Sequence, residues 1–191
     1  MPPKKKFSKK QIIDSAFEIA RKEGINGVTI RNVANHLGSS IAPIYVNFKD
    51  VEELKQSVIM KIVEISKRML AQQDSGTPFR DMGIASLRFA KEYGVLFKDF
   101  VMNQNDYLDQ YNQEMGGEFL GAMKSDSDLE GFTEEELLVI LLKMRIFTTG
   151  LSMMTANGML PEEWSEERII ELMDSTAVDV IAGARLRKKG N

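Results

Sequence analysis

The sequence predicts an all-α protein, in which a small N-terminal domain of three helices (residues 1–50) precedes a larger helical domain (residues 51–191). Apolar residues recur at three- and four-residue steps along most of the chain, which is the spacing of one buried helix face. Capping residues such as Ser8 and Thr133 stand just before several of these stretches, and glycine or proline often follows them. We therefore expect helices joined by short loops throughout.

The first helix is marked at both ends. Ser8 and Gln11 form a capping-box pattern, in which each side chain can hydrogen-bond the backbone of the other residue. Ile12 and Ala16 belong to an apolar stripe on one face, and Gly24 can end the helix. We expect this helix to support the next two as a three-helix core.

The next two helices are short and close together. Thr29 is an N-cap candidate for the first of them, and Gly38 can adopt the left-handed conformation that ends it. Ser40 can cap the second, whose first turn would contain Pro43 without harm because the first-turn N–H groups have no helical partner. Two short helices joined by a glycine-containing turn are typical of a helix-turn-helix, whose second helix enters the DNA major groove.

Charge is distributed unevenly along the chain. Residues 1–50 hold nine Lys and Arg and four acidic residues, a balance of +5, whereas the remainder holds sixteen basic and twenty-four acidic residues, a balance of −8. A basic end beside an acidic body favours a polyanionic partner at that end. A solvated lysine tail is the alternative for the lysine run alone, but its combination with a helix-turn-helix favours double-stranded DNA.

A family resemblance follows from these elements. The first helix, then TIRNVANHLG, SS and IAPIYVNF (residues 29–48), then an acidic and apolar helix start, resemble the N-terminal domain of the TetR/AcrR family of transcriptional repressors. The resemblance covers about residues 7 to 60, and its most specific part is the aromatic pair Tyr45 and Phe48. Beyond residue 60 it extends only to length and helical character. It implies a dimeric repressor that a small effector releases from its DNA operator.

The chain departs from the family pattern at three positions. Ser39 stands where the family usually has an apolar residue, and Asn47 and Val51 stand where it usually has His and Lys. The family Lys commonly holds a backbone phosphate, and Lys49 is placed to substitute for it. These departures leave an alternative open, a protein-interaction adaptor that kept the fold and lost DNA binding or effector response.

The predicted DNA contacts divide into two kinds. Small or apolar residues at the start of the second short helix face base edges, so thymine methyl contacts and one hydroxyl are expected there rather than Arg–guanine pairs. Tyr45, Asn47, Lys49 and the backbone N–H of Thr29 are expected at phosphates, although Tyr45 could instead pack on Phe48. The full set is Thr29, Ser39, Ser40, Ile41, Ala42, Pro43, Tyr45, Asn47, Lys49, Lys4, Lys5 and Lys6. Ile44 and Phe48 are assigned to the core.

The larger domain begins with a long predicted helix over residues 49–73, followed by a break at 74–78. Helices over 79–93, 95–102 and 105–124 follow, and a loop covers 125–131. Thr133 and Glu136 form a capping box for the penultimate helix, and Ser165 can cap the last one.

The penultimate helix is apolar on more than one face, so it needs packing partners on more than one side. In the family that the chain resembles, the last two helices pair with those of a second subunit, and a two-fold dimer suits a palindromic operator. The candidate interface residues are Leu151, Met154, Ile170, Met173, Ala177 and Ile181. The alternative is that both helices only fill the core of their own chain.

Methionine is abundant, at 12 of 191 residues, and most of it lies in the larger domain. Methionine is over-used at surfaces that accept varied apolar ligands. Together with aromatic residues it predicts a largely apolar effector pocket, although a core that uses methionine as filler is the alternative for any single residue. The candidates are Met82, Phe89, Phe97, Met102, Tyr107, Tyr111, Met115, Phe119, Met144 and Phe147.

Other function classes lack their sequence signals. The chain has no cysteine and one histidine, His36, and no phosphate-binding, zinc-protease or serine-hydrolase motif, so we expect no enzyme, metal or cofactor. Acidic pairs at helix starts fit the helix dipole rather than catalysis. No apolar run approaches the roughly 20 residues of a membrane span, and the lysine-rich start leads into an amphipathic helix. We expect a cytoplasmic protein.

Overall fold

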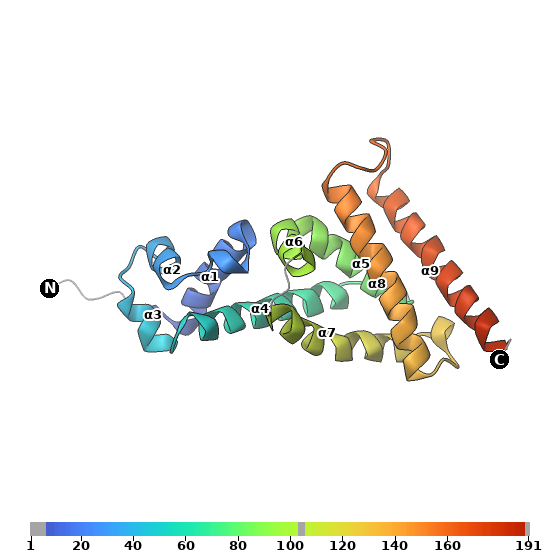
Figure 1. Cartoon of the computed structure of the whole chain (residues 1–191), viewed down its shortest axis with the longest axis horizontal. Helices are drawn as coiled ribbons and strands as arrows, with labels where there is room; N and C mark the ends of the chain where they lie inside the picture. The colour runs from blue at the N-terminus through green and yellow to red at the C-terminus, as the bar shows by residue number, and fades with distance from the viewer. Residues whose placement is uncertain (1–6, 103–105, 190–191) are drawn as a thin grey trace. The chain divides into compact units, whose positions relative to one another are not determined.

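The computed structural model describes residues 7–102 and 106–189, and within these ranges it contains helices and no strand (Figure 1). The predicted all-α class is therefore confirmed. The α-helices are α1 (Lys9–Glu23), α2 (Ile30–His36), α3 (Ala42–Asn47), α4 (Val51–Ala71), α5 (Pro78–Glu92), α6 (Gly94–Met102), α7 (Asp106–Lys124), α8 (Glu134–Ala156) and α9 (Glu166–Lys189). Two short 3₁₀ helices, η1 (Ile25–Gly27) and η2 (Ser127–Leu129), lie in connections.

The chain divides into two compact units. The first comprises Met1–Ile65 and Tyr93–Asn112, and the second comprises Ser66–Glu92 and Gln113–Asn191. The first unit thus contains most of α4, all of α6 and the start of α7 in addition to the predicted three-helix domain. This division concerns packing, and the functional boundary expected at residue 50 stays a prediction.

Local capping explains where the first helices begin and end. Ser8 and Gln11 form the predicted capping box of α1, which ends at Gly24 with φ +80°. The Thr29 hydroxyl accepts the Asn32 N–H at 3.1 Å and caps α2 as predicted. The Ser40 cap is wrong: Ile41 is the N-cap of α3, without a side-chain cap hydrogen bond, although Pro43 does lie in the first turn.

Helix α6 is tied to the connection between α1 and α2 within the first unit. The buried carboxylate of Asp99 accepts the Ile25 N–H through Oδ2 at 2.7 Å. A Cβ atom at Gly24 would lie 3.1 Å from the same oxygen, so a glycine lets the chain pass close to the carboxylate. This contact joins residues 74 positions apart in the sequence. No local sequence pattern predicts it.

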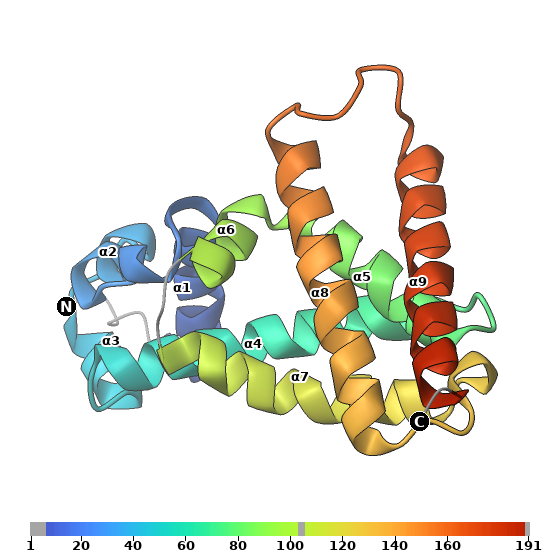
Figure 2. The same cartoon turned by 45° about the vertical axis from the view of Figure 1, so that its right-hand side comes forward.

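The second unit is built on α5, α8 and α9, which pack against one another. Helices α8 and α9 run side by side in both views (Figures 1 and 2). Their shared core is apolar and includes residues from the α7–α8 connection. Its buried members are Phe79, Met82, Ile84, Met123, Leu129, Leu137, Ile140, Met144, Leu151 and Met173.

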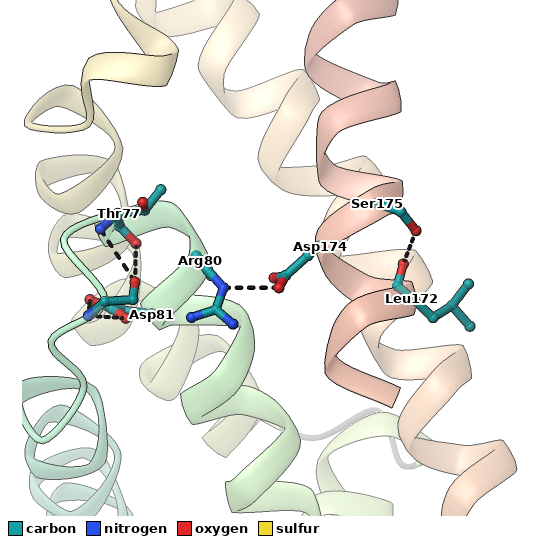
Figure 3. A network of polar contacts seen from close by, with 7 residues as sticks. Thr77, Arg80, Asp81, Leu172, Asp174 and Ser175 are labelled. Atoms are coloured by element: carbon teal, nitrogen blue, oxygen red, sulfur yellow. Dashed lines mark hydrogen bonds and ion pairs between the residues drawn. The ribbon is translucent and has the colours of Figure 1, made fainter. Parts of the chain in front are cut away.

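Polar contacts hold the start of α5 in place (Figure 3). The guanidinium of Arg80 donates to Asp174 of α9 at 2.9 Å, which joins these two helices at their surface. The Asp81 carboxylate accepts the Ser75 N–H at 3.2 Å, and this fixes the turn before the helix. The predicted break at residues 74–78 is therefore an ordered turn.

Helix α8 is the most apolar helix of the second unit. Among the described residues it alone is long and apolar enough to cross a membrane, with a mean hydropathy of 1.6 over an 18-residue window of which 33% is buried. The sequence expectation that no segment approaches such a span therefore needs correction for α8. The core helix of a soluble protein can have the same length and composition.

Candidate DNA-binding interface

Helices α2 and α3 form a helix-turn-helix. Gly38 has φ +62°, and beyond it the Ser39 N–H donates to the Ala34 carbonyl at 2.9 Å, which closes the end of α2. Val33 and Ala34 of α2 and Ile44 of α3 are buried, so both helices turn an apolar face inward. The assignment of Ile44 and Phe48 to the core is confirmed.

The opposite face of α3 lies open to solvent. Ile41 is 50% exposed, Tyr45 is 55% exposed and Val46 is 85% exposed. Ser40 and Ala42 are exposed as well, whereas Pro43 is half-buried. The ring of Tyr45 is thus exposed whereas that of Phe48 is buried, and the choice between a phosphate contact and packing on Phe48 stays a prediction. The residues expected at base edges therefore lie on an accessible surface.

Basic groups and one carboxylate flank the end of α3. The Lys9 ammonium lies 4.9 Å from the centre of the Phe48 ring and 3.3 Å from Glu53 Oε1. The Lys49 N–H donates to Glu53 Oε2 at 2.8 Å, and its side chain is exposed. These contacts, the Lys49 N–H first and Lys9 second, lower the pKa of Glu53 below its ordinary value, so Glu53 is ionised at neutral pH.

Several of the other predicted DNA contacts already make hydrogen bonds within the chain. The Asn47 side-chain amide donates to the Pro43 carbonyl at 2.8 Å, which engages one of its two N–H groups. Thr29 is exposed, with its hydroxyl engaged in the α2 cap. Ser39 is half-buried, and its hydroxyl donates to the Ser40 carbonyl at 2.9 Å. Lys4, Lys5 and Lys6 lie outside the described residues.

The single histidine has a structural partner. Nδ1 of His36, in α2, lies 2.8 Å from the hydroxyl of the buried Ser15 in α1. This hydrogen bond helps to join α1 and α2. Over residues 7–102 and 106–189, no group of three or more His, Cys, Asp or Glu side chains could hold a metal ion.

The predicted effector residues fall in both units. In the second unit, Met82 and Met144 are core members, Phe119 and Phe147 pack against the core, and Phe89 and Met115 are buried. In the first unit, Tyr111 contacts the ring of Phe100 at 5.2 Å between centroids. Phe97 and Tyr107 are half-buried there, and the Tyr107 hydroxyl donates to Glu52. The side chain of Met102 lies outside the described part of the chain.

Most of the residues predicted at the dimer interface are buried or partly buried in the single chain. Leu151 and Met173 are buried in the core of their own chain, as the alternative of a filled monomer core expects, and their part in a dimer stays a prediction. Ile170, Ala177 and Ile181 are partly buried and pack against the same core. Of the six, Met154 alone is exposed.

Sequence reasoning missed two exposed surfaces. Val46 was not among the predicted DNA contacts, although it is the most exposed large apolar residue of α3. On α8 and α9, other apolar residues than those predicted lie open, and they define a surface called here the α8–α9 apolar face. Its members are Leu138, Val139, Leu142, Ile146, Val178 and Leu186.

The sequence is similar to known regulators. No protein-family model matches the chain. The HTH-type transcriptional regulator SAR2658 of Staphylococcus aureus is 23% identical over 150 residues, covering 74% of this chain and 81% of that protein. The nicotine-responsive transcriptional repressor HdnoR of Paenarthrobacter nicotinovorans is 25% identical over 69 residues, which are 36% of each chain.

The fold is also similar to solved structures. A TetR/AcrR family regulator from Thermobifida fusca superposes with a TM-score of 0.55 at 17% identity, over 92% of this chain and 97% of that chain. At such identity the likeness establishes the fold. The chain thus has the fold of a TetR/AcrR regulator, as the motif at residues 29–48 predicted.

Proposed function

We propose that this chain, whose fold is that of the TetR/AcrR regulators, is a sequence-specific DNA-binding transcriptional regulator that acts as a dimeric repressor. The observation that carries the proposal is the exposed face of α3, held outward by the buried Ile44 and Phe48 in a helix-turn-helix. The excess of basic over acidic residues in positions 1–50 supports a phosphate-rich partner on this side.

Selection of duplexes from a random library by the purified protein, at about 0.15 M salt, tests the proposal. We expect a palindrome whose half-sites lie about one helical turn, or a multiple of it, apart. Recovery of nothing above background by folded protein would overturn DNA binding. It would favour the adaptor, the alternative that the departures at Ser39 and Val51 leave open.

We further propose that a small, largely apolar effector releases the protein from its operator. The methionine-rich and aromatic composition supports this proposal, and so does the name of one relative, a nicotine-responsive repressor. A panel of apolar and cationic compounds, nicotine among them, should contain one that raises the melting temperature and weakens operator binding. The two effects belong together because a ligand shifts an equilibrium only through different affinities for two states.

Dimerisation through α8 and α9 completes the proposal. The α8–α9 apolar face supports it, since several large apolar residues on two neighbouring helices lie open in the single chain. Interfaces of permanent homodimers are often apolar in this way and resemble the core of a domain. The partners of the chain would then be duplex DNA, an effector and a second copy of itself.

An enzyme is not proposed, because the relatives are transcriptional regulators and the sequence lacks catalytic motifs. We place the protein in the cytoplasm, where an operator is accessible. The apolar character of α8 is assigned to the core and the dimer rather than to a membrane. A monomer that partitions into lipid vesicles would contradict this assignment.

A further inference from the structure

The exposed face of α3 is almost entirely hydrocarbon. Ile41 and Tyr45 form one row at four-residue spacing, and Ala42 and Val46 form a second row beside it. All four side chains are exposed. Residues 39–48 contain no Lys, Arg, Gln, Asp or Glu, and the one amide, Asn47, donates to the Pro43 carbonyl at 2.8 Å.

The structure of the free chain does not account for Val46. Its side chain is 85% exposed, so it contributes little to the core. Valine is also a weaker helix former than alanine, because its branched Cβ loses rotamer freedom in a helix. Neither burial nor helix propensity accounts for an apolar branched residue at this position, whereas contact with an external partner would.

We propose that Val46 and Ile41 contact the C5-methyl groups of thymines, so that the operator is selected through methyl contacts. This inference rests on the proposed DNA-binding function and specifies its substrate. In the major groove, Arg and Lys recognise guanine, Asn and Gln recognise adenine, and Glu and Asp recognise cytosine, whereas the thymine methyl is the apolar feature. The exposed face of α3 offers only the last kind of contact, apart from the hydroxyls of Ser40 and Tyr45.

Charge favours DNA over a protein as the occupant of this face. Residues 1–50 carry a balance of +5, and the side chains of Lys9, Lys10, Arg31 and Lys49 are exposed. An apolar strip on a basic domain matches the major groove, where methyl groups lie between two rows of phosphates. Thymines should accordingly recur at fixed positions in each half-site.

Deoxyuridine, which is thymine without the methyl group, tests the proposal. After the library selection, each thymine of the recovered site is replaced singly by deoxyuridine, and the affinity of the full chain is measured by fluorescence anisotropy. At the contacted thymines we expect about fourfold weaker binding for each lost methyl group. In Val46→Ala the penalty at one of these thymines should disappear, because its apolar partner is gone.

Val95→Ala is the matched control, since Val95 is also an exposed valine of the first unit but lies on α6. It should retain the full deoxyuridine penalty. Equal affinity for the thymine and deoxyuridine sites at every position would overturn methyl recognition and leave DNA binding intact. Failure of folded protein to select any duplex would instead remove the proposed function itself, so the two failures are distinguishable.

Discussion

Tyr45 combines an exposed aromatic ring with a hydroxyl on the surface of α3 that we propose faces DNA. Because a phosphate is the same in every sequence, a Tyr45–phosphate contact should contribute affinity and not specificity. Tyr45→Phe removes only the hydroxyl and should weaken binding to selected and scrambled duplexes alike. A hydrogen bond to a charged group is worth about 1.5–3 kcal/mol, which corresponds to at least a tenfold loss.

Tyr93→Phe provides the control, because Tyr93 packs edge-on against Phe17 at 6.0 Å between centroids and its ring is retained. Affinity measured by anisotropy on both duplexes should be unchanged in this variant. If Tyr45→Phe altered the preferred sequence without weakening affinity, the assignment of Tyr45 to a phosphate would be wrong.

Asp99 links α6 to the connection between α1 and α2 in the first unit. Its carboxylate is buried and accepts the Ile25 N–H at 2.7 Å. Asp99→Ala leaves that N–H without its acceptor and should destabilise the unit by about 1–3 kcal/mol. Asp99→Asn keeps an oxygen acceptor and should cost less.

Hydrogen exchange at the amide of Ile25 measures this effect locally, and urea unfolding measures it globally. Asp109→Ala, which removes an exposed aspartate of α7, should change neither quantity. Exchange at Ile25 that is equally slow in the wild type and in Asp99→Ala would mean that α6 does not hold this connection.

At the scale of elements, most helix boundaries follow from local sequence, the start of α3 being the exception, whereas the surroundings of a helix do not. Thr29 and Thr133 cap their helices as predicted because a cap involves only the next three residues. Leu151 and Leu142 lie on the same helix and are equally apolar, yet one is buried and the other exposed. Periodicity cannot separate them, since α8 is apolar around most of its circumference.

At the candidate DNA-binding interface, too, the sequence predicted local features and did not predict long-range contacts. The sequence placed Ile44 in the core and the start of α3 at the surface, and burial confirms both. The sequence prediction did not include Val46, whose exposure on the open face of α3 becomes visible only in the structure. The link between Asp99 and Ile25 is long-range and has no sequence pattern.

Glu136 belongs to the capping box at the start of α8, so this helix start should respond to acid. The Glu136 carboxylate accepts the Thr133 N–H at 2.7 Å and lies 2.9 Å from the Lys188 ammonium of α9. These contacts, the Thr133 N–H first, lower the pKa of Glu136 below its ordinary value of 4.5. The stabilisation is therefore complete above pH 4.5 and is lost as the pH falls through the lower folded-state pKa.

Glu136→Gln removes this titration. We expect the wild type to melt at a higher temperature than the variant at neutral pH, and the difference to shrink as the pH falls below 4.5. Glu64→Gln, which changes an exposed glutamate in the middle of α4, serves as the control and should follow the wild type throughout. A constant difference between Glu136→Gln and the wild type down to pH 3 would contradict the role given to the carboxylate.

At the scale of the whole molecule, operator binding and assembly should depend on one surface. The α8–α9 apolar face carries Leu142 and Ile146 on α8 and Val178 on α9. A charge in the centre of a buried apolar interface is left unpaired and desolvated, which opposes association strongly. A monomer would then contact one half-site at a time and lose most of its affinity for a palindrome.

Ile146→Glu should therefore convert a dimer into a folded monomer, as measured by light scattering after size exclusion, with unchanged helical content by circular dichroism. Its affinity for the palindrome should fall at least 100-fold while weak binding to a single half-site persists. Met159→Glu is closely matched, because Met159 is 65% exposed and Ile146 is 66% exposed, but Met159 lies beyond the end of α8. It should remain a dimer with full affinity. A dimeric Ile146→Glu protein would place the subunit interface elsewhere, and a monomeric wild type that still binds the palindrome tightly would remove the need for one.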